Sequence, residues 1–116
     1  MAFEEFQVGQ QNGAGPIHCR FHSIVVGIAP RHSDSVDVKF LVEGRPVIVA
    51  LPHLAIAEYN RSRGVKLTDL DIIQMAGLFL KRLLERGEAL REPYISPSRE
   101  EALDLARAIV NSTAGR

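Results

Sequence analysis

The chain has 116 residues, 46% of them hydrophobic and 24% charged, and its mass of 12.8 kDa is that of one globular domain. Its 14 basic and 14 acidic residues balance, which excludes a strongly basic nucleic-acid-binding arm and an acidic tail. The single cysteine, Cys19, excludes an internal disulfide and the paired cysteines of common zinc modules.

The first 16 residues are predicted to form a flexible arm. Residues 9–16, GQQNGAGP, contain three glycines and a proline, which is the composition of a loop. Before them, Phe3 and Phe6 either dock on a partner surface or belong to a frayed end. No positively charged start with an apolar run is present, so we expect no secretory signal. No stretch has the ~18 apolar residues of a membrane helix, and we expect a cytoplasmic protein without membrane contact.

Three strands are predicted next. Residues 17–29 alternate at first and then become apolar on both faces, and Gly27 could mark a bulge. Residues 36–43, VDVKFLVE, alternate throughout, and residues 47–51, VIVAL, form a short apolar strand. A turn cluster separates the first two strands and EGRP separates the last two. Consecutive strands with short connections predict an antiparallel meander.

Two helices are predicted after the strands. Residues 53–62 follow a proline and precede Gly64, a suitable helix stop. The second helix is the strongest signal in the sequence and runs from Thr68, a suitable N-cap, to Gly87. Acidic residues follow Thr68 and basic residues precede Gly87, which is the order that the helix dipole favours.

A last helix is predicted near the C-terminus. It begins either at Ser98, which forms a capping box with Glu101, or at Ser96 with Pro97 in the first turn. Strands first and helices afterwards predict an α+β fold. We expect a three-stranded antiparallel meander, then a short helix, a long central apolar helix and a C-terminal helix packed on the sheet. The domain is expected over residues 17–112, with a frayed end over residues 113–116.

The long helix has more apolar surface than one core face requires, since only a narrow strip is polar. It is either buried on all sides within one chain or partly covered by a second subunit. Gly77 costs about 1 kcal/mol relative to alanine in the middle of a helix, which a close backbone approach would explain. We favour a homodimer. The predicted interface residues are Leu78, Phe79, Leu83, Phe3 and Phe6.

The polar face of the first strand predicts a second kind of site. His18, Arg20 and His22 alternate with apolar residues, and Arg31 and His32 lie across the following turn. Imidazoles beside an arginine suit a carboxylate or phosphate, with an affinity that rises below about pH 6.5. On a strand, His18 and His22 lie about 13 Å apart, so we expect no shared metal ion.

The sequence contains no recognisable group of catalytic residues. His32, Ser33 and Asp34 are adjacent on a turn, whereas a triad needs residues from distant segments. Cys19 lies on the apolar face of its strand and is predicted to be a core thiol. The basic loop around Arg61 is read as a solvated surface. We expect no cofactor and no nucleic-acid partner.

The sequence thus favours a small non-catalytic interaction or accessory protein whose partner is a second copy of itself or another protein. The alternative is a small-ligand or anion-binding domain that uses the histidine face. An enzyme is the third reading, since sites built from distant residues are hard to see in one sequence.

Overall fold

The computed structural model describes residues 3–9, 15–27, 35–64, 66–87 and 94–114, with the backbone alone at 25–27 and 111–114. The elements in chain order are β1 (Glu5–Val8), β2 (Ile17–Gly27), β3 (Ser35–Val42), β4 (Arg45–Pro52), α1 (His53–Arg63), α2 (Asp69–Glu85), β5 (Tyr94–Ile95) and α3 (Arg99–Ala114). The predicted α+β class is confirmed.

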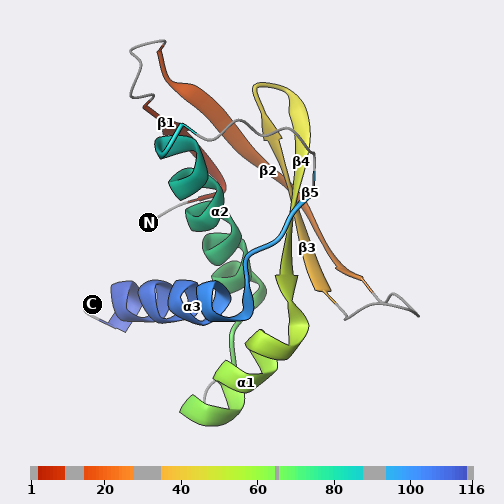
Figure 1. Ribbon diagram of the computed structural model, residues 1–116, viewed down its shortest axis with the longest axis vertical. Coiled ribbons are helices and arrows are strands. Elements are labelled where there is room, and N and C mark those ends of the chain that lie inside the picture. Colours follow the sequence, from red (N-terminus) through yellow and green to blue (C-terminus); the bar gives the residue numbers. More distant parts are fainter. Residues whose placement is uncertain (1–2, 10–14, 28–34, 65, 88–93, 115–116) are drawn as a thin grey trace.

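One mixed sheet forms the scaffold. Its strand order is β1-β2-β3-β4-β5, and every pair is antiparallel except the parallel pair of β4 and β5. In Figure 1, α2 and α3 lie on one side of the sheet, and α1 continues from β4 and packs against α3. The predicted three-stranded meander therefore has too few strands, because two further strands, β1 and β5, extend the sheet.

The two added strands are short. β1 has four residues within the predicted arm and pairs with β2, with Glu5 opposite Arg20 and Val8 opposite Ile17. β5 has two residues and pairs with β4. Segments of this length carry too few positions for an alternating pattern to stand out. Residues 5–8 therefore belong to the sheet and not to a free arm, while residues 10–14 lie outside the described part.

A bulge in β2 lies at His22 and not at Gly27. The pairing register with β3 shifts between Phe21 and Ser23, so that His22 is the extra residue. Because of this shift, Phe21 and Ile24 both lie opposite buried residues of β3. The bulge thus explains why strict alternation ends in the middle of the predicted strand.

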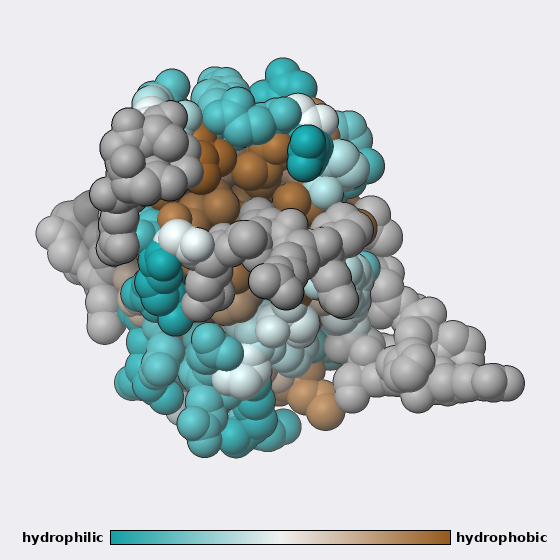
Figure 2. Space-filling model, turned by 45° about the horizontal axis from the view of Figure 1, so that its top comes forward, coloured by the Kyte–Doolittle hydropathy of each residue, from teal (hydrophilic) through white to brown (hydrophobic). Residues whose placement is uncertain are grey.

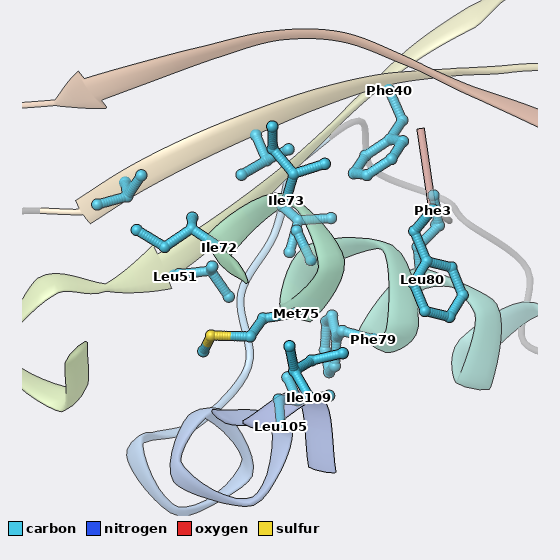
Figure 3. Packing of buried hydrophobic residues seen from close by; sticks show 14 of the residues in the cluster. Phe3, Phe40, Leu51, Ile72, Ile73, Met75, Phe79, Leu80, Leu105 and Ile109 are labelled. Atoms are coloured by element: carbon cyan, nitrogen blue, oxygen red, sulfur yellow. The ribbon is translucent and has the colours of Figure 1, made fainter. Parts of the chain in front are cut away.

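The hydrophobic core lies between the sheet and the helices (Figure 3). In β3 every second side chain is buried, which is the period of a strand with one covered face. Phe40, which is fully buried, lies at the centre of this set. Its ring meets those of Phe6 and Phe21 edge to face, with centroids 6.1 and 6.2 Å apart. The strand alternation predicted for this segment is confirmed.

Local signals fix the helix ends as the sequence predicts. Thr68 and Asp71 form a capping box at the start of α2, and Ser98 and Glu101 form one before α3. Ser96, the alternative cap, donates its hydroxyl to the carbonyl of Ala50 in β4. The α3 helix runs to Ala114, two residues past the predicted end of the domain.

Candidate functional site

The chain's own N-terminal segment covers part of α2. A Cβ atom added at Gly77 would lie 2.3 Å from Cβ of Phe3, so only glycine permits this contact. Beside it, the backbone N–H of Phe3 donates to Oε1 of Gln74 at 2.9 Å, and Nε2 of Gln74 donates to Oε1 of Glu4 at 3.3 Å. The close approach predicted at Gly77 is present, and the segment that makes it comes from the same chain.

This packing changes the predicted interface set. Phe79 and Phe3 are only 6% and 3% exposed and are covered within one chain, so they are not available to a second subunit. The sheet, α3 and the N-terminal segment together account for most of the apolar surface of α2. Phe6, Leu78 and Leu83 are half-buried and pack against the core.

The predicted anion face is only partly assembled. His18 and Arg20 lie on the face of the sheet opposite the helices, whereas His22 is in the bulge and its Nδ1 lies 3.0 Å from the Ser23 hydroxyl. Arg31 and His32 lie outside the described residues. The structure therefore does not bring the three described side chains to one point.

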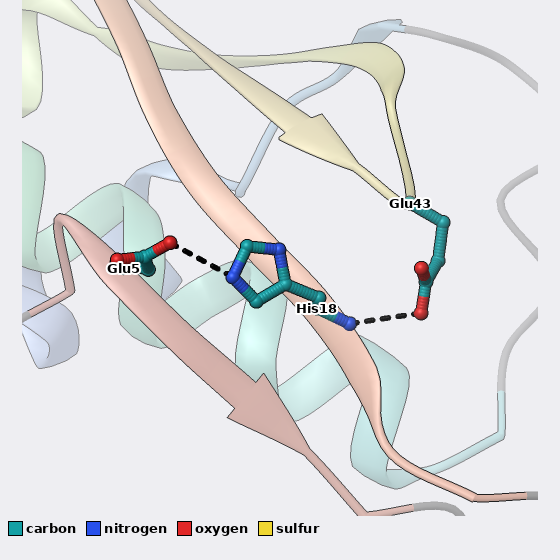
Figure 4. Close-up of polar contacts among 3 residues, drawn as sticks. All are labelled: Glu5, His18 and Glu43. Atoms are coloured by element: carbon teal, nitrogen blue, oxygen red, sulfur yellow. Dashed lines mark hydrogen bonds and ion pairs between the residues drawn. The ribbon is translucent and has the colours of Figure 1, made fainter.

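Two carboxylates adjoin His18 (Figure 4). Nε2 of His18 lies 2.9 Å from Oε2 of Glu5, and its backbone N–H donates to Oε1 of Glu43 at 3.0 Å. Glu43 reaches this position from the β3–β4 turn, where it and Gly44 have φ of 51° and 80°, as in a tight two-residue hairpin. Acidic neighbours oppose the binding of an anion at His18, so the geometry does not favour the ligand-binding alternative.

Within the described ranges, no group of three or more His, Cys, Asp or Glu residues is placed to hold a metal ion. None of the helices described is long and apolar enough to cross a membrane.

Cys19 lies in the core. Its side chain is fully buried on β2, opposite Val42 and Phe6. Burial, with a smaller effect from the nearby Glu43 carboxylate, raises the pKa of the thiol from 9.0 to about 11. A protonated thiol is a poor nucleophile, so Cys19 is a structural residue, as its position on the strand predicts.

This raised pKa predicts a pH dependence of stability. Between pH 9 and 11 the thiol ionises in the unfolded chain but keeps its proton in the folded one, so unfolding releases a proton and stability falls as pH rises. Below pH 9 the thiol contributes no slope. Urea denaturation from pH 7 to 10.5 should show a drop that is smaller in Cys19→Ala. Equal slopes for the two proteins would contradict the burial of a protonated thiol.

The described helices α2 and α3 lie on one side of the sheet, and none of the described helices covers its other face (Figure 1). We call this other face the open face. Leu41 and Ile48 are half-buried there and Tyr94 is 48% exposed. Ile48 pairs directly with Tyr94 across β4 and β5. The described side chains of the open face are Glu5, Gln7, His18, Arg20, Ser23, Ser35, Asp37, Lys39, Leu41, Pro46, Ile48, Ala50, Pro52 and Tyr94.

The open face is mixed in character. Apolar Leu41, Ile48 and Tyr94 lie on β3, β4 and β5, but β3 also carries Asp37 and Lys39 there, with Lys39 opposite Ile48. On β1 and β2, Glu5 is opposite Arg20. The sequence analysis identified the polar residues of β2 but missed Leu41 and Ile48, which occupy positions that alternate with the core residues.

A second apolar area lies at one end of the molecule. Figure 2 turns the end with the β3–β4 turn forward and shows apolar atoms in a hollow bordered by hydrophilic residues.

Comparison with protein-family models, with curated protein sequences and with solved structures finds no match to this chain.

Proposed function

We propose that this chain is a non-catalytic interaction protein that works as a homodimer. The observation that carries the proposal is the one-sided sheet. The described helices pack on one face, while the open face keeps Leu41, Ile48 and Tyr94 partly in contact with water. A sheet is most stable when its apolar surface is buried against another layer, and contiguous apolar surface on a small protein is typical of a contact site.

A second copy is the occupant that the charges support. The whole chain has 14 basic and 14 acidic residues, so two copies do not repel each other through net charge. The open face itself carries both signs: Glu5 is opposite Arg20, and β3 carries Asp37 and Lys39. Two-fold dimers are also the commonest assemblies of soluble proteins.

The sequence places self-association on α2, and that location is kept as the competing one. Of the five residues predicted for that contact, Leu78 and Leu83 reach the surface of α2. A dimer that uses them supports the same function through another surface.

The experiment is a measurement of molar mass in solution. Light scattering over micromolar concentrations should give twice the chain mass of 12.8 kDa, with dissociation on dilution. A mass of one chain at every concentration would overturn the proposal.

A further inference from the structure

We infer that the surface under residues 3–8 is a binding site for an extended peptide segment of another protein, which competes there with the chain's own segment. We call residues 3–8 the N-terminal segment. The surface under it consists of the edge of β2 from Ile17 to Phe21 and the face of α2 around Gln74 and Gly77, and we call it the β2–α2 surface. A peptide partner here is separate from the homodimer proposed above and uses a different surface.

The N-terminal segment binds β2 as an added strand binds the edge of a sheet. All of β1 pairs antiparallel with β2, and the pairing continues to Phe21, whose backbone N–H donates to the carbonyl of Glu4 at 2.6 Å. On the covered side, Val8 is 1% exposed and Phe6 is half-buried. In strand addition, backbone hydrogen bonds supply the affinity and pockets for alternate side chains supply the specificity. The edge of β2 therefore offers both to an extended peptide.

The face of α2 adds contacts that suit a chain segment of particular chemistry. Gln74 is 7% exposed. Its Oε1 accepts the backbone N–H of Phe3 at 2.9 Å, and its Nε2 donates to Oε1 of Glu4 at 3.3 Å. Gly77 lies one turn further along the same face and leaves room for the Phe3 side chain, which lies against α2 in Figure 3. A buried amide beside a glycine thus selects a backbone N–H next to an aromatic ring.

The β2–α2 surface is supported by parts of the fold other than the N-terminal segment. On its other edge, β2 is paired with β3 from Cys19 to Gly27, and α2 packs against α3 and the sheet. The N-terminal segment itself has only two buried side chains, Phe3 and Val8. Segments with few buried contacts open at a lower free energy than the core does. Opening of the N-terminal segment therefore leaves the surface in place for another peptide.

The N-terminal segment defines the chemistry of the competing peptide. Phe3, Phe6 and Val8 pack into the core, while Glu5 and Gln7 are exposed, so the partner segment carries apolar side chains in the spacing Phe-x-x-Phe-x-Val. A second copy is a weak competitor, because its own segment is already bound at an effective concentration on the order of millimolar. A segment of another protein has no such bound state to leave, and it displaces the N-terminal segment when it buries more apolar surface. The half-buried Phe6 is the position at which that gain is available.

Peptide binding to the whole chain is the first arm of the test. The double variant Phe3→Ser/Phe6→Ser removes both aromatic anchors of the N-terminal segment and leaves the residues of the β2–α2 surface unchanged. A fluorescently labelled peptide of residues 1–9 should bind this variant with a Kd about tenfold or more below that for the wild type, because the competing segment is weakened. Fluorescence anisotropy at micromolar protein concentrations measures both constants.

Three controls separate this surface from others. A peptide with serine at both phenylalanine positions keeps the length and charge of the probe and should not bind. Gly77→Leu, added to the double variant, fills the position beside α2 that Phe3 occupies and should abolish binding. Leu70 is 53% exposed in the first turn of α2, so Leu70→Ser removes an apolar side chain elsewhere and should leave the Kd at its wild-type value.

Hydrogen exchange of the wild-type protein gives a second readout, which decides the question if the double variant does not fold. The Phe21 N–H is bonded to Glu4 of the N-terminal segment, so it exchanges whenever that segment opens. Val38 is fully buried in β3, between β2 and β4, and its amide should exchange only when the whole domain unfolds. Relative to their intrinsic rates, we expect the Phe21 amide to exchange about tenfold or more faster than the Val38 amide.

The outcomes are distinct. Tighter binding of the peptide by the double variant, together with its loss on Gly77→Leu, supports the peptide site. Absence of binding to a folded double variant overturns it, as does a Phe21 amide that exchanges no faster than that of Val38. If the peptide binds a wild-type dimer and separates it into single chains, a second copy is the partner of this surface, and the assignment to another protein is overturned.

Discussion

Gly77→Ala is expected to destabilise the fold by about 2 kcal/mol, although alanine is the better helix former by about 1 kcal/mol. The new Cβ would lie 2.3 Å from Cβ of Phe3, a separation that forces the N-terminal segment off α2. The displaced Phe3 ring loses its burial, worth about 2 kcal/mol, and its edge-to-face contact with Phe6 at 5.3 Å, worth about 1 kcal/mol. Urea denaturation measures the difference.

The effect of Gly77→Ala on stability should change sign when Phe3 is also replaced by glycine, which makes this prediction specific. The three nearest atoms to the added Cβ all belong to the Phe3 side chain. Phe3→Gly removes them, so Gly77→Ala should then stabilise the protein by about 1 kcal/mol. Phe3→Ala keeps the Cβ that lies closest and should retain the conflict. If Gly77→Ala has the same effect in the wild-type and Phe3→Gly backgrounds, the contact between Phe3 and Gly77 does not exist.

Phe40→Ala is expected to destabilise the protein by about 4 kcal/mol. Its ring is fully buried and meets two other aromatic rings. The adjacent Leu41 lies on the opposite side of β3, where it is half-buried on the open face. Leu41→Ala should therefore cost less than about 1 kcal/mol. Denaturation at low protein concentration, where association contributes least, compares the two.

Comparing the stability costs of Phe40→Ala and Leu41→Ala tests whether only one face of the sheet is covered. A cost of several kcal/mol for Leu41→Ala, similar to that of Phe40→Ala, would mean that both faces of β3 are covered within one chain. The open face would then be occupied and unable to receive a second copy.

Features encoded by neighbouring residues could be predicted from the sequence. The alternation of residues 36–43 identified β3, and its direction, with Phe40 inward, is the one that the structure has. Thr68 with the following aspartates located the start of α2, and Ser98 with Glu101 located that of α3. These signals operate within one turn or one strand, so no tertiary information is needed to find them.

Features that depend on distant segments were missed. β1 is stabilised by its pairing with β2 and not by its own four residues. Glycine suggested the bulge at Gly27, but the pairing register places it at His22, because a bulge is a property of two strands. The excess apolar surface of α2 suggested a second subunit, whereas Phe3 of the same chain occupies the position beside Gly77. Only the three-dimensional arrangement reveals which segment covers which.

In the candidate site too, features encoded by neighbouring residues could be predicted and features that depend on distant segments could not. His18 and Arg20 are on one face of β2 as the period of a strand requires, but the sequence could not show that Glu5 and Glu43 come to His18. Both contacts depend on pairing between strands. Acidic neighbours supplied by other strands changed the chemistry expected for the histidine face.

The packing of Phe3 against α2 also affects how the chain folds during its synthesis. Gln74, which receives the Phe3 N–H, is 71 residues further along the chain. At the usual rate of synthesis, about 5–20 residues per second, Phe3 leaves the ribosome roughly 4–14 s before Gln74 does. During that interval the first strand can pair with the second, but Phe3 has no helix to pack against. The segment around Phe3 is thus made before its partner on α2 and is among the last to reach its native contacts.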